Sequence, residues 1–325
     1  MTLQKLIKLP CEIFFQGSFF ISRNSLFLSF ALNMKLSYPS KVYLNGEWLK
    51  PEEAKISVFD RGFLFGDGIY EVIPFYSGKL FLLKEHLQRL RYSLREVELQ
   101  CDISDFESII LKAIELTELN AADGAIYIQV SRGMAPRTHY FPENYDATVL
   151  VYAYKTNLRG FQNQFKDVLV SNDLRWHRCD IKSVSLMANI LANTEAKKSD
   201  FSENIMIRDG YFTEGSHSSL FFVKDESVYT HPNGKFILPG ITRNLLIKLC
   251  KENNIAIVEK ALPVSELDEV TEVFITGTTT QITAIKNLHF PDRIINFGND
   301  IGKVTRRLQL LFCEEVKKRT GVDIS

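Results

Sequence analysis

The most restrictive feature of this sequence is a hairpin signal that recurs along its length. Short runs of apolar and polar residues flank two-residue turns at Asn45-Gly46, Ser77-Gly78 and Asp209-Gly210. Both residues of such a turn need a positive φ, which glycine, asparagine and aspartate tolerate best. The sequence therefore predicts antiparallel strand pairs in both halves of the chain.

Amphipathic helices are expected between these strands. Residues 82–99 and 104–120 carry apolar side chains at helical spacing, and residues 186–198 also have a helical pattern. A further helix is expected after Pro239-Gly240, with Thr242 as its N-cap. Because strands outnumber helices in both halves, the pattern favours an α+β fold of two domains, the second with a barrel-like sheet.

Two segments before the first of these helices are assigned from shorter patterns. Residues 56–60 are predicted to form a strand, and residues 61–68 are predicted to form a glycine-bearing loop. Lys182 is expected to follow a strand and to precede a helix.

The domain boundary is placed in the polar, glycine-bearing segment 156–164. This choice gives an N-terminal α/β domain of residues 41–157, which is sandwich-like, and a C-terminal domain of residues 158–320. Residues 1–40 differ in character, and Met34 stands where a natural start would fit. We favour an over-long gene start; a poorly ordered tail and a cleaved targeting segment are the alternatives.

Charge and cysteine content exclude several classes of protein. Lysine plus arginine equals aspartate plus glutamate, 39 each, so no bulk attraction to nucleic acid or an anionic membrane is expected. No apolar run reaches the roughly 18–20 residues of a membrane span. The five cysteines contain no CxxC pair, which argues against a zinc site or a disulfide framework. A reducing, cytoplasmic location and no metal are therefore expected.

Two polar residues could carry chemistry. Lys182 lies among apolar neighbours, where desolvation favours the neutral amine that attacks a carbonyl. Glu214 lies in a Thr-Glu-Gly-Ser loop, where a carboxylate could hold a pyridine nitrogen protonated. Taken singly, each residue fits a simpler interpretation, a surface lysine or a solvated turn carboxylate.

Several segments could bind a phosphate group. The helix expected after Gly240 offers free backbone amides at its N-terminus, with a hydroxyl at Thr242. Thr278 lies in a second loop of small and hydroxyl residues, and Arg89 carries a guanidinium that suits phosphate. The nucleotide-binding patterns GxxxxGK[ST] and GxGxxG do not occur, so a nucleotide-binding module is not indicated.

The joint pattern resembles a known family. The segments FDRGFLFGDGIYE, EHLQRL, SRGMAPRTHYFPEN, RCDIKS, TEGS, ILPGITR and ITGTT follow one another in the order of the class IV, fold-type IV pyridoxal-phosphate aminotransferases. The likeness is strongest to the D-amino-acid (D-alanine) aminotransferases and covers about residues 41–312. It implies pyridoxal 5'-phosphate as the cofactor and a homodimer as the active form.

The resemblance also implies a role for individual residues. Lys182 is similar to the lysine that forms a Schiff base with the cofactor, and Glu214 to the partner of the pyridine nitrogen. The phosphate cradle would consist of Arg89, Thr278 and the amides of Ile241 and Thr242, while Leu238 would pack on the cofactor ring. The substrate carboxylate would be held by Tyr70, Arg137 and His139, with the loop of Arg137 and His139 supplied by the other subunit.

The implied activity is ping-pong transamination between a D-amino acid of the D-alanine type and a 2-oxo acid such as 2-oxoglutarate or pyruvate. An aminodeoxychorismate lyase and a branched-chain L-amino-acid aminotransferase are alternatives within the family. A catalytically retired, cofactor-binding regulatory protein is an alternative of another class. The chain departs from the family pattern at His217 and Ser219, where the family loop usually has a serine and an asparagine, and at Gly277, where D-alanine enzymes can carry a hydroxyl residue.

Overall fold

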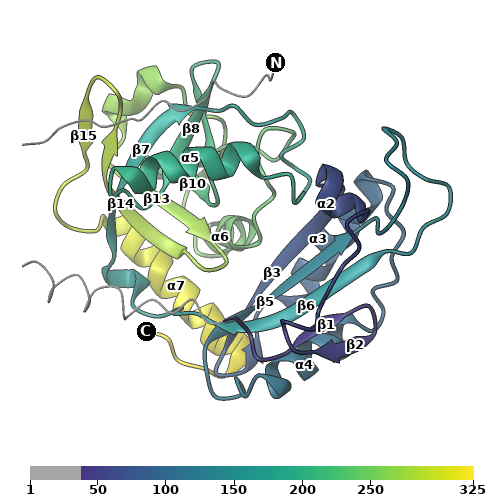
Figure 1. The fold of residues 1–325 in the computed structure, drawn as a ribbon. Coiled ribbons are helices and arrows are strands. Elements are labelled where there is room, and N and C mark those ends of the chain that lie inside the picture. The colour runs from purple at the N-terminus through teal and green to yellow at the C-terminus, as the bar shows by residue number, and fades with distance from the viewer. Residues whose placement is uncertain (1–37) are drawn as a thin grey trace, which may run out of the picture. The chain divides into compact units, whose positions relative to one another are not determined.

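The glycine turns that the sequence singles out each join two antiparallel strands in this computed structural model, which describes residues 38–325 (Figure 1). The pairs are β1 (Val42–Leu44) with β2 (Glu47–Leu49), β3 (Gly68–Tyr76) with β4 (Lys79–Leu80), and β8 (Asn204–Arg208) with β9 (Tyr211–Gly215). Both residues of every turn have a positive φ, for example 50° at Asn45 and 100° at Gly46. The three hairpin predictions are confirmed, whereas the predictions about residues 1–37 lie outside the described residues.

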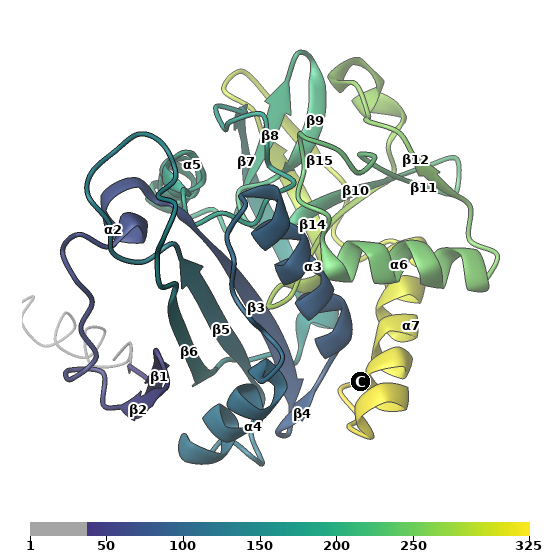
Figure 2. The same cartoon turned by 90° about the vertical axis from the view of Figure 1, so that its right-hand side faces the viewer.

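The first sheet is antiparallel and is covered by helices on one face (Figure 2). Within residues 38–325 its strand order is β2-β1-β6-β5-β3-β4, with β5 at Gly124–Ser131 and β6 at Thr148–Lys155. The two predicted helices form as α3 (Leu83–Glu96) and α4 (Phe106–Leu116). They bury the sheet face that carries Ile73, Ile128 and Val151, because alternate residues of a strand point to the same side.

The second sheet is mixed and larger. Its order is β12-β11-β10-β13-β14-β7-β8-β9, with β15 paired to β14. The open order, with β12 and β9 at its edges, is a half-barrel and agrees with the expected barrel-like sheet. The bounds are β7 Phe165–Asn172, β10 Ser219–Lys224, β11 Ser227–Thr230, β12 Ile257–Glu259, β13 Glu272–Gly277, β14 Gln281–His289 and β15 Ile294–Asn296.

Three helices pack on this second sheet, as Figure 1 shows. They are α5 (Met187–Lys198), α6 (Ile241–Glu252) and α7 (Lys303–Thr320), and the first two lie where the sequence predicts helices. Short 3-10 turns form at η1 (Phe161–Asn163) and η2 (Val264–Glu269). None of the helices in the described part of the chain is both long and apolar enough to span a membrane.

The connection between the two sheets coincides with the predicted boundary segment 156–164. Apolar contacts nevertheless cross it, because Tyr76 and Phe81 pack in the same buried cluster as Phe312 of α7. The hydroxyl of Tyr76 also accepts a hydrogen bond from Gln281 at 2.8 Å. Residues 39–325 form one compact unit, and the division into domains 41–157 and 158–320 stays a prediction.

Three local predictions are wrong. Residues 56–60 form no strand, and the predicted loop contains a short helix, α2 (Arg61–Phe65). The reason is Asp60, a buried N-cap whose carboxylate accepts hydrogen bonds from the amide of Gly62 at 2.8 Å and from the hydroxyls of Ser131 and Thr148. Thr242 is likewise not an N-cap, because α6 already begins at Ile241.

Candidate active site

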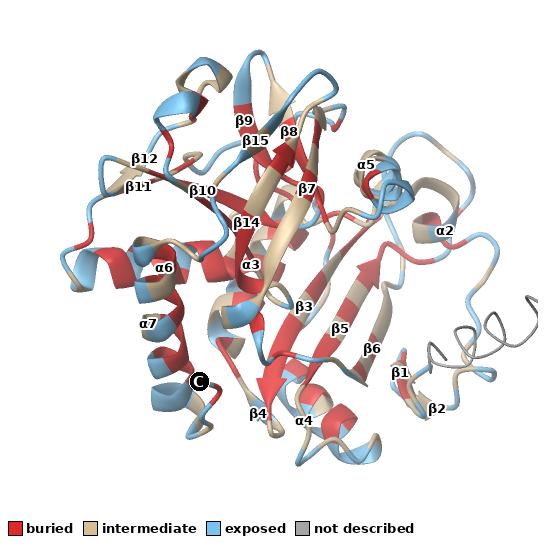
Figure 3. Cartoon of the chain, turned by 90° about the vertical axis from the view of Figure 1, so that its left-hand side faces the viewer, coloured by how far each residue is buried: buried red, intermediate tan, exposed pale blue. Residues whose placement is uncertain are grey.

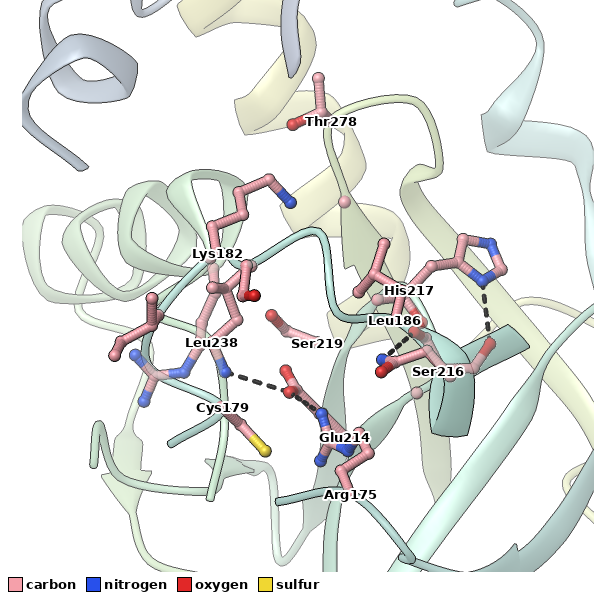
Figure 4. A pocket seen from close by; sticks show the side chains of 18 of the residues that line it. Arg175, Cys179, Lys182, Leu186, Glu214, Ser216, His217, Ser219, Leu238 and Thr278 are labelled. Atoms are coloured by element: carbon pink, nitrogen blue, oxygen red, sulfur yellow. Dashed lines mark hydrogen bonds and ion pairs between the residues drawn. The ribbon is translucent and has the colours of Figure 1, made fainter. Parts of the chain in front are cut away.

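Eight of the ten predicted site residues line one cavity, and Lys182 is among them (Figure 4). The prediction that Lys182 directly follows a strand is wrong, because Lys182 lies in an irregular segment before α5. Its carbonyl accepts a hydrogen bond from the amide of Tyr70 at 2.9 Å, and its own amide donates to the hydroxyl of Ser93 at 3.2 Å. These contacts fix the backbone of Lys182 against β3 and α3 and leave its side chain half-buried in the cavity.

Glu214 lies across the cavity from Lys182, at the end of β9. Its Oε1 accepts hydrogen bonds from Arg175 and from the amide of Leu238, the latter at 3.0 Å. Neither contact uses Oε2, which remains available to a ligand. Burial raises the pKa of Glu214, and the positive charge of Arg175 opposes that rise. The ion pair therefore favours an ionised carboxylate at the cavity floor.

Arg175 is itself held by a second buried carboxylate. Its Nε and Nη2 donate to the two oxygens of Asp173, each at 2.9 Å. Arg208 contacts the same aspartate at 3.1 Å. Asp173, Arg175 and Glu214 thus form a continuous chain of alternating charge, which fixes the orientation of Glu214.

The N-terminus of α6 forms another wall of the cavity. Its N-cap, Gly240, makes no side-chain capping bond, and the first backbone amides of the helix point out of the helix end. A Cβ at Gly240 would lie 2.6 Å from Oγ of Ser219, so glycine permits this close approach. The amides of Ile241 and Thr242, with the hydroxyl of Thr278, could bind an anion such as a phosphate group.

Arg89 completes this anion-binding wall. Its Nε and Nη2 donate to the carboxylate of Glu71 at 2.9 and 2.6 Å, and Nη1 donates to the carbonyl of Pro239 at 3.1 Å. These bonds use three of its five N–H groups, so two remain for a ligand. Burial alone would raise the pKa of Glu71, but Arg89 and His86 hold it well below its usual range.

Tyr70, Leu238 and Cys179 line the same cavity. The ammonium of Lys182 lies 4.1 Å from the centroid of the Tyr70 ring. Burial raises the pKa of Cys179 to about 11, and its thiol donates to the carbonyl of Trp176 at 3.2 Å. Cys179 is therefore a packed, protonated side chain rather than a nucleophile.

Arg137 and His139 are not brought into the cavity of their own chain. Both lie exposed on the loop between β5 and β6, where they pack on Phe65 of α2. The guanidinium of Arg137 lies 5.0 Å from the Phe65 ring centroid, and the His139 ring lies 5.8 Å from it. The predicted carboxylate trap is therefore incomplete within one chain.

The three positions that depart from the family pattern all line the cavity. Ser219 contacts the N-terminus of α6, as described above. A Cβ at Gly277 would meet only ordinary contacts, the nearest 3.5 Å away, so a side chain would fit there. His217 lies on the side opposite Leu238 and is half-exposed (Figure 4).

Sequence reasoning missed the residues that orient the predicted ones, above all Arg175 and Glu71. Glu71 offered a signal, because it is an acidic residue inside the apolar strand Gly68–Tyr76 and must find a partner when buried. Arg175 offered none, because its partner Glu214 lies 39 residues away in the sequence.

Known proteins resemble this chain in sequence and in fold. Residues 68–288 match the family described as amino-transferase class IV. A D-alanine aminotransferase of Staphylococcus aureus is 40% identical over 273 residues, which cover 83% of this chain and 95% of that protein. The fold matches a crystal structure of an Escherichia coli branched-chain amino acid aminotransferase with a TM-score of 0.78 and 27% identity, over 87% of this chain and 96% of the other.

A third match is a crystal structure of a branched-chain aminotransferase from the archaeon Thermoproteus uzoniensis with norvaline. Its TM-score is 0.73, with 25% identity over 88% of this chain and 99% of that one. The chain shares its α+β fold with these amino-group-transferring enzymes. This chain belongs to the class IV aminotransferases. It is accordingly an enzyme, an aminotransferase.

Proposed function

We propose that this enzyme uses pyridoxal phosphate to move an amino group between a D-amino acid of the D-alanine type and a 2-oxo acid such as 2-oxoglutarate or pyruvate. The observation that carries the proposal is the convergence of Lys182, Glu214 and the α6 N-terminus on one cavity. The D-specific form is supported by a relative named D-alanine aminotransferase, which is 40% identical to this chain. The solved structure that represents the branched-chain alternative is 27% identical.

The described residues fit the cofactor. A phosphate would find two unused N–H groups of Arg89, the amides of Ile241 and Thr242 and the Thr278 hydroxyl. The free Oε2 of Glu214 could accept a hydrogen bond from a protonated ring nitrogen. The hydroxyl of Thr276 is buried in the cavity wall and has no hydrogen-bond partner among residues 38–325, as expected where a ligand completes a site.

Each residue then has a defined task. Bound pyridoxal phosphate supplies an aldehyde that takes up amino groups and a ring that delocalises negative charge. Lys182 would hold the cofactor through its Nζ, and the same atom would take the α-proton from the amino acid. Glu214 would keep the ring nitrogen of the cofactor protonated, and Leu238 would present an apolar surface to the ring. Two half-reactions alternate at this lysine, giving ping-pong kinetics.

We further propose that the active form is a homodimer in which the partner's loop completes the substrate site. Large apolar side chains are exposed around α2, the β5–β6 loop and α5, and α2 and α5 lie next to each other (Figures 2 and 3). Exposed patches of this kind mark interfaces. The residues concerned are Phe63, Met134, Tyr140, Met187, Ile190 and Leu191. A cytoplasmic location remains the expectation, supported by the free thiols of the four described cysteines.

A substrate assay tests the proposal. The purified protein, supplied with pyridoxal phosphate and 2-oxoglutarate, is expected to form pyruvate from D-alanine and no 2-oxoisocaproate from L-leucine. The reason is that Tyr70, Arg137 and His139 would anchor the carboxylate on the side that exposes the α-proton of a D-amino acid to Lys182. L-alanine is the matched control. Activity with L-leucine alone would overturn the D-specific assignment. If neither D-alanine nor L-leucine gave a product, the result would support the alternative of a catalytically retired, cofactor-binding regulatory protein.

The ion pair of Arg175 and Glu214 predicts a pH effect. In Arg175→Met the charge that opposes the burial of Glu214 is lost, so the pKa of Glu214 rises further. Glu214 must be ionised to pair with the ring nitrogen, and activity is lost as the pH falls through this pKa. The acid limb of the kcat/KM profile is therefore expected to move to higher pH.

Two variants serve as controls for that prediction. Arg175→Lys keeps a positive charge and is expected to keep the acid limb close to that of the wild type. Arg178→Met removes a nearby arginine that pairs with Glu96 and Asp180, outside the Glu214 network, and should not move it. An unchanged acid limb in a folded Arg175→Met protein would show that Arg175 does not control the ionisation of Glu214.

A further inference from the structure

A second cavity adjoins the first one, and its lining is basic. The 157–164 connection, β7, the end of α5 and the turn between β13 and β14 form its walls. Its charged lining residues are Arg159, Lys166, Lys197 and His217, and no carboxylate lines it among the described residues. This one-sided charge distinguishes the cavity from the protein as a whole, whose formal net charge is zero. An anion is the ligand that such a lining favours.

Two of these cations are not neutralised by neighbours. Arg159 forms an ion pair with Asp123, which compensates its charge. Lys166 and Lys197, in contrast, form no ion pair with any residue of the described part of the chain, 38–325. Their ammonium groups can therefore turn toward a ligand without breaking an existing contact.

His217 connects this basic cavity to the one that contains Lys182, because it lines both. Its Nδ1 lies 2.9 Å from Oε2 of the fully buried Glu203, which also accepts a 2.7 Å hydrogen bond from Ser218. Partial burial lowers the pKa of His217, but Glu203 outweighs it and the pKa is raised; Lys197 and Lys182 are close enough to oppose that rise. With Nδ1 held by Glu203, Nε2 is the atom left to donate to a ligand.

The turn between β13 and β14 also separates the two cavities. Thr278 lines the cavity of Lys182, whereas the next residues, Thr279 and Thr280, line the basic cavity. A substrate that reacts at Lys182 would enter the basic cavity by extending its far end past this turn, toward Lys166 and Lys197. Its far end would meet cations and hydroxyl donors, which suit a carboxylate.

We propose that the basic cavity, through Lys166, Lys197 and His217, is the subsite that binds the distal carboxylate of dicarboxylic substrates, such as 2-oxoglutarate and its D-amino counterpart. The proposal rests on the function proposed above. In this arrangement the His217 imidazole supplies a donor where the cavity of Lys182 meets the basic cavity.

The test compares a dicarboxylic with a monocarboxylic acceptor. The D-amino acid donor is kept the same, and the measured quantity is the ratio of kcat/KM for 2-oxoglutarate to kcat/KM for pyruvate. This ratio is expected to fall about tenfold in Lys166→Met and in Lys197→Met, and severalfold in His217→Ser. The reason is that each change removes a charge-assisted bond to the distal carboxylate. Lys198→Met is the matched control, since Lys198 is exposed on α5 and lines neither cavity. It should leave the ratio unchanged.

A binding measurement separates this proposal from the proposed function. Calorimetry on the wild-type protein is expected to detect glutarate but not butyrate, and Lys166→Met with Lys197→Met should abolish the glutarate signal. Glutarate binding without any transamination would overturn the proposed function and leave the subsite standing. The subsite would be overturned if all variants catalysed transamination with the same ratio of kcat/KM for 2-oxoglutarate to kcat/KM for pyruvate. It would also be overturned if inorganic phosphate bound as tightly as glutarate.

Discussion

Replacing Lys182 with alanine is expected to abolish transamination and to remove the site at which borohydride fixes the cofactor to the protein. The amine of Lys182 has two tasks, covalent attachment and proton transfer, and general acid–base catalysis alone contributes about 10²–10⁴ in rate. Loss of both tasks should lower kcat by at least about four orders of magnitude. Stopped-time assays of product, together with mass spectrometry of peptides after borohydride reduction, measure the two effects separately.

The label location decides what a loss of activity means. In the wild type the reduced adduct is expected on the peptide that contains Lys182, and Lys198→Ala, on the exposed side of α5, should give the same adduct and wild-type turnover. Lys182→Ala should still fold, because the contacts that fix this segment use the backbone of Lys182 rather than its side chain. An adduct that persists on another lysine in Lys182→Ala would sink the assignment.

The sequence predicted those parts of the fold that local chemistry determines. The turns at Asn45-Gly46 and Asp209-Gly210 were predictable because few residues tolerate a positive φ at two consecutive positions. The helices α3 and α4 were predictable from their apolar spacing. Residues 56–65 were not, because the helix α2 depends on hydrogen bonds of Asp60 to Ser131 and Thr148, which come from distant strands.

The candidate site divides in the same way. Lys182 and Glu214 were predictable only as members of an ordered set of motifs, since neither residue differs locally from an ordinary surface residue. The residues that orient them, such as Arg175 and Glu71, act through contacts between positions far apart in the sequence. The place of Glu71 in an apolar strand indicates that it needs a partner, but no periodicity or spacing identifies Arg89 as that partner or joins Arg175 to Glu214.

The exposed position of Arg137 leads to the second large effect, the recovery of activity by mixing two inactive variants. Arg137 lies outside the cavity of its own chain, yet a substrate carboxylate needs a cation beside Tyr70. Arg137→Ala is therefore expected to lower kcat/KM for D-alanine by about 10²–10³, the value of a bidentate charged bond. Lys182→Ala alone is inactive for the reason given above.

Subunits of these two variants complement each other only if the loop acts across the dimer. In a mixed dimer one site combines Lys182 of the Arg137→Ala subunit with Arg137 of the Lys182→Ala subunit, while the other site has neither. Random exchange of subunits makes half of all dimers mixed, so about a quarter of wild-type activity should return. Unfolding and refolding the two variants together, followed by an assay with D-alanine, measures the recovery.

A matched pair of variants shows why this result depends on the interface. Glu214 and Lys182 line the same cavity of one chain, so a mixture of Glu214→Ala and Lys182→Ala subunits should show no gain over Glu214→Ala alone. If Arg137 served its own chain, the first mixture would behave like the second, because every site would then lack one of the two residues. Recovery in the first mixture alone would therefore mean that the enzyme needs its partner subunit for substrate binding.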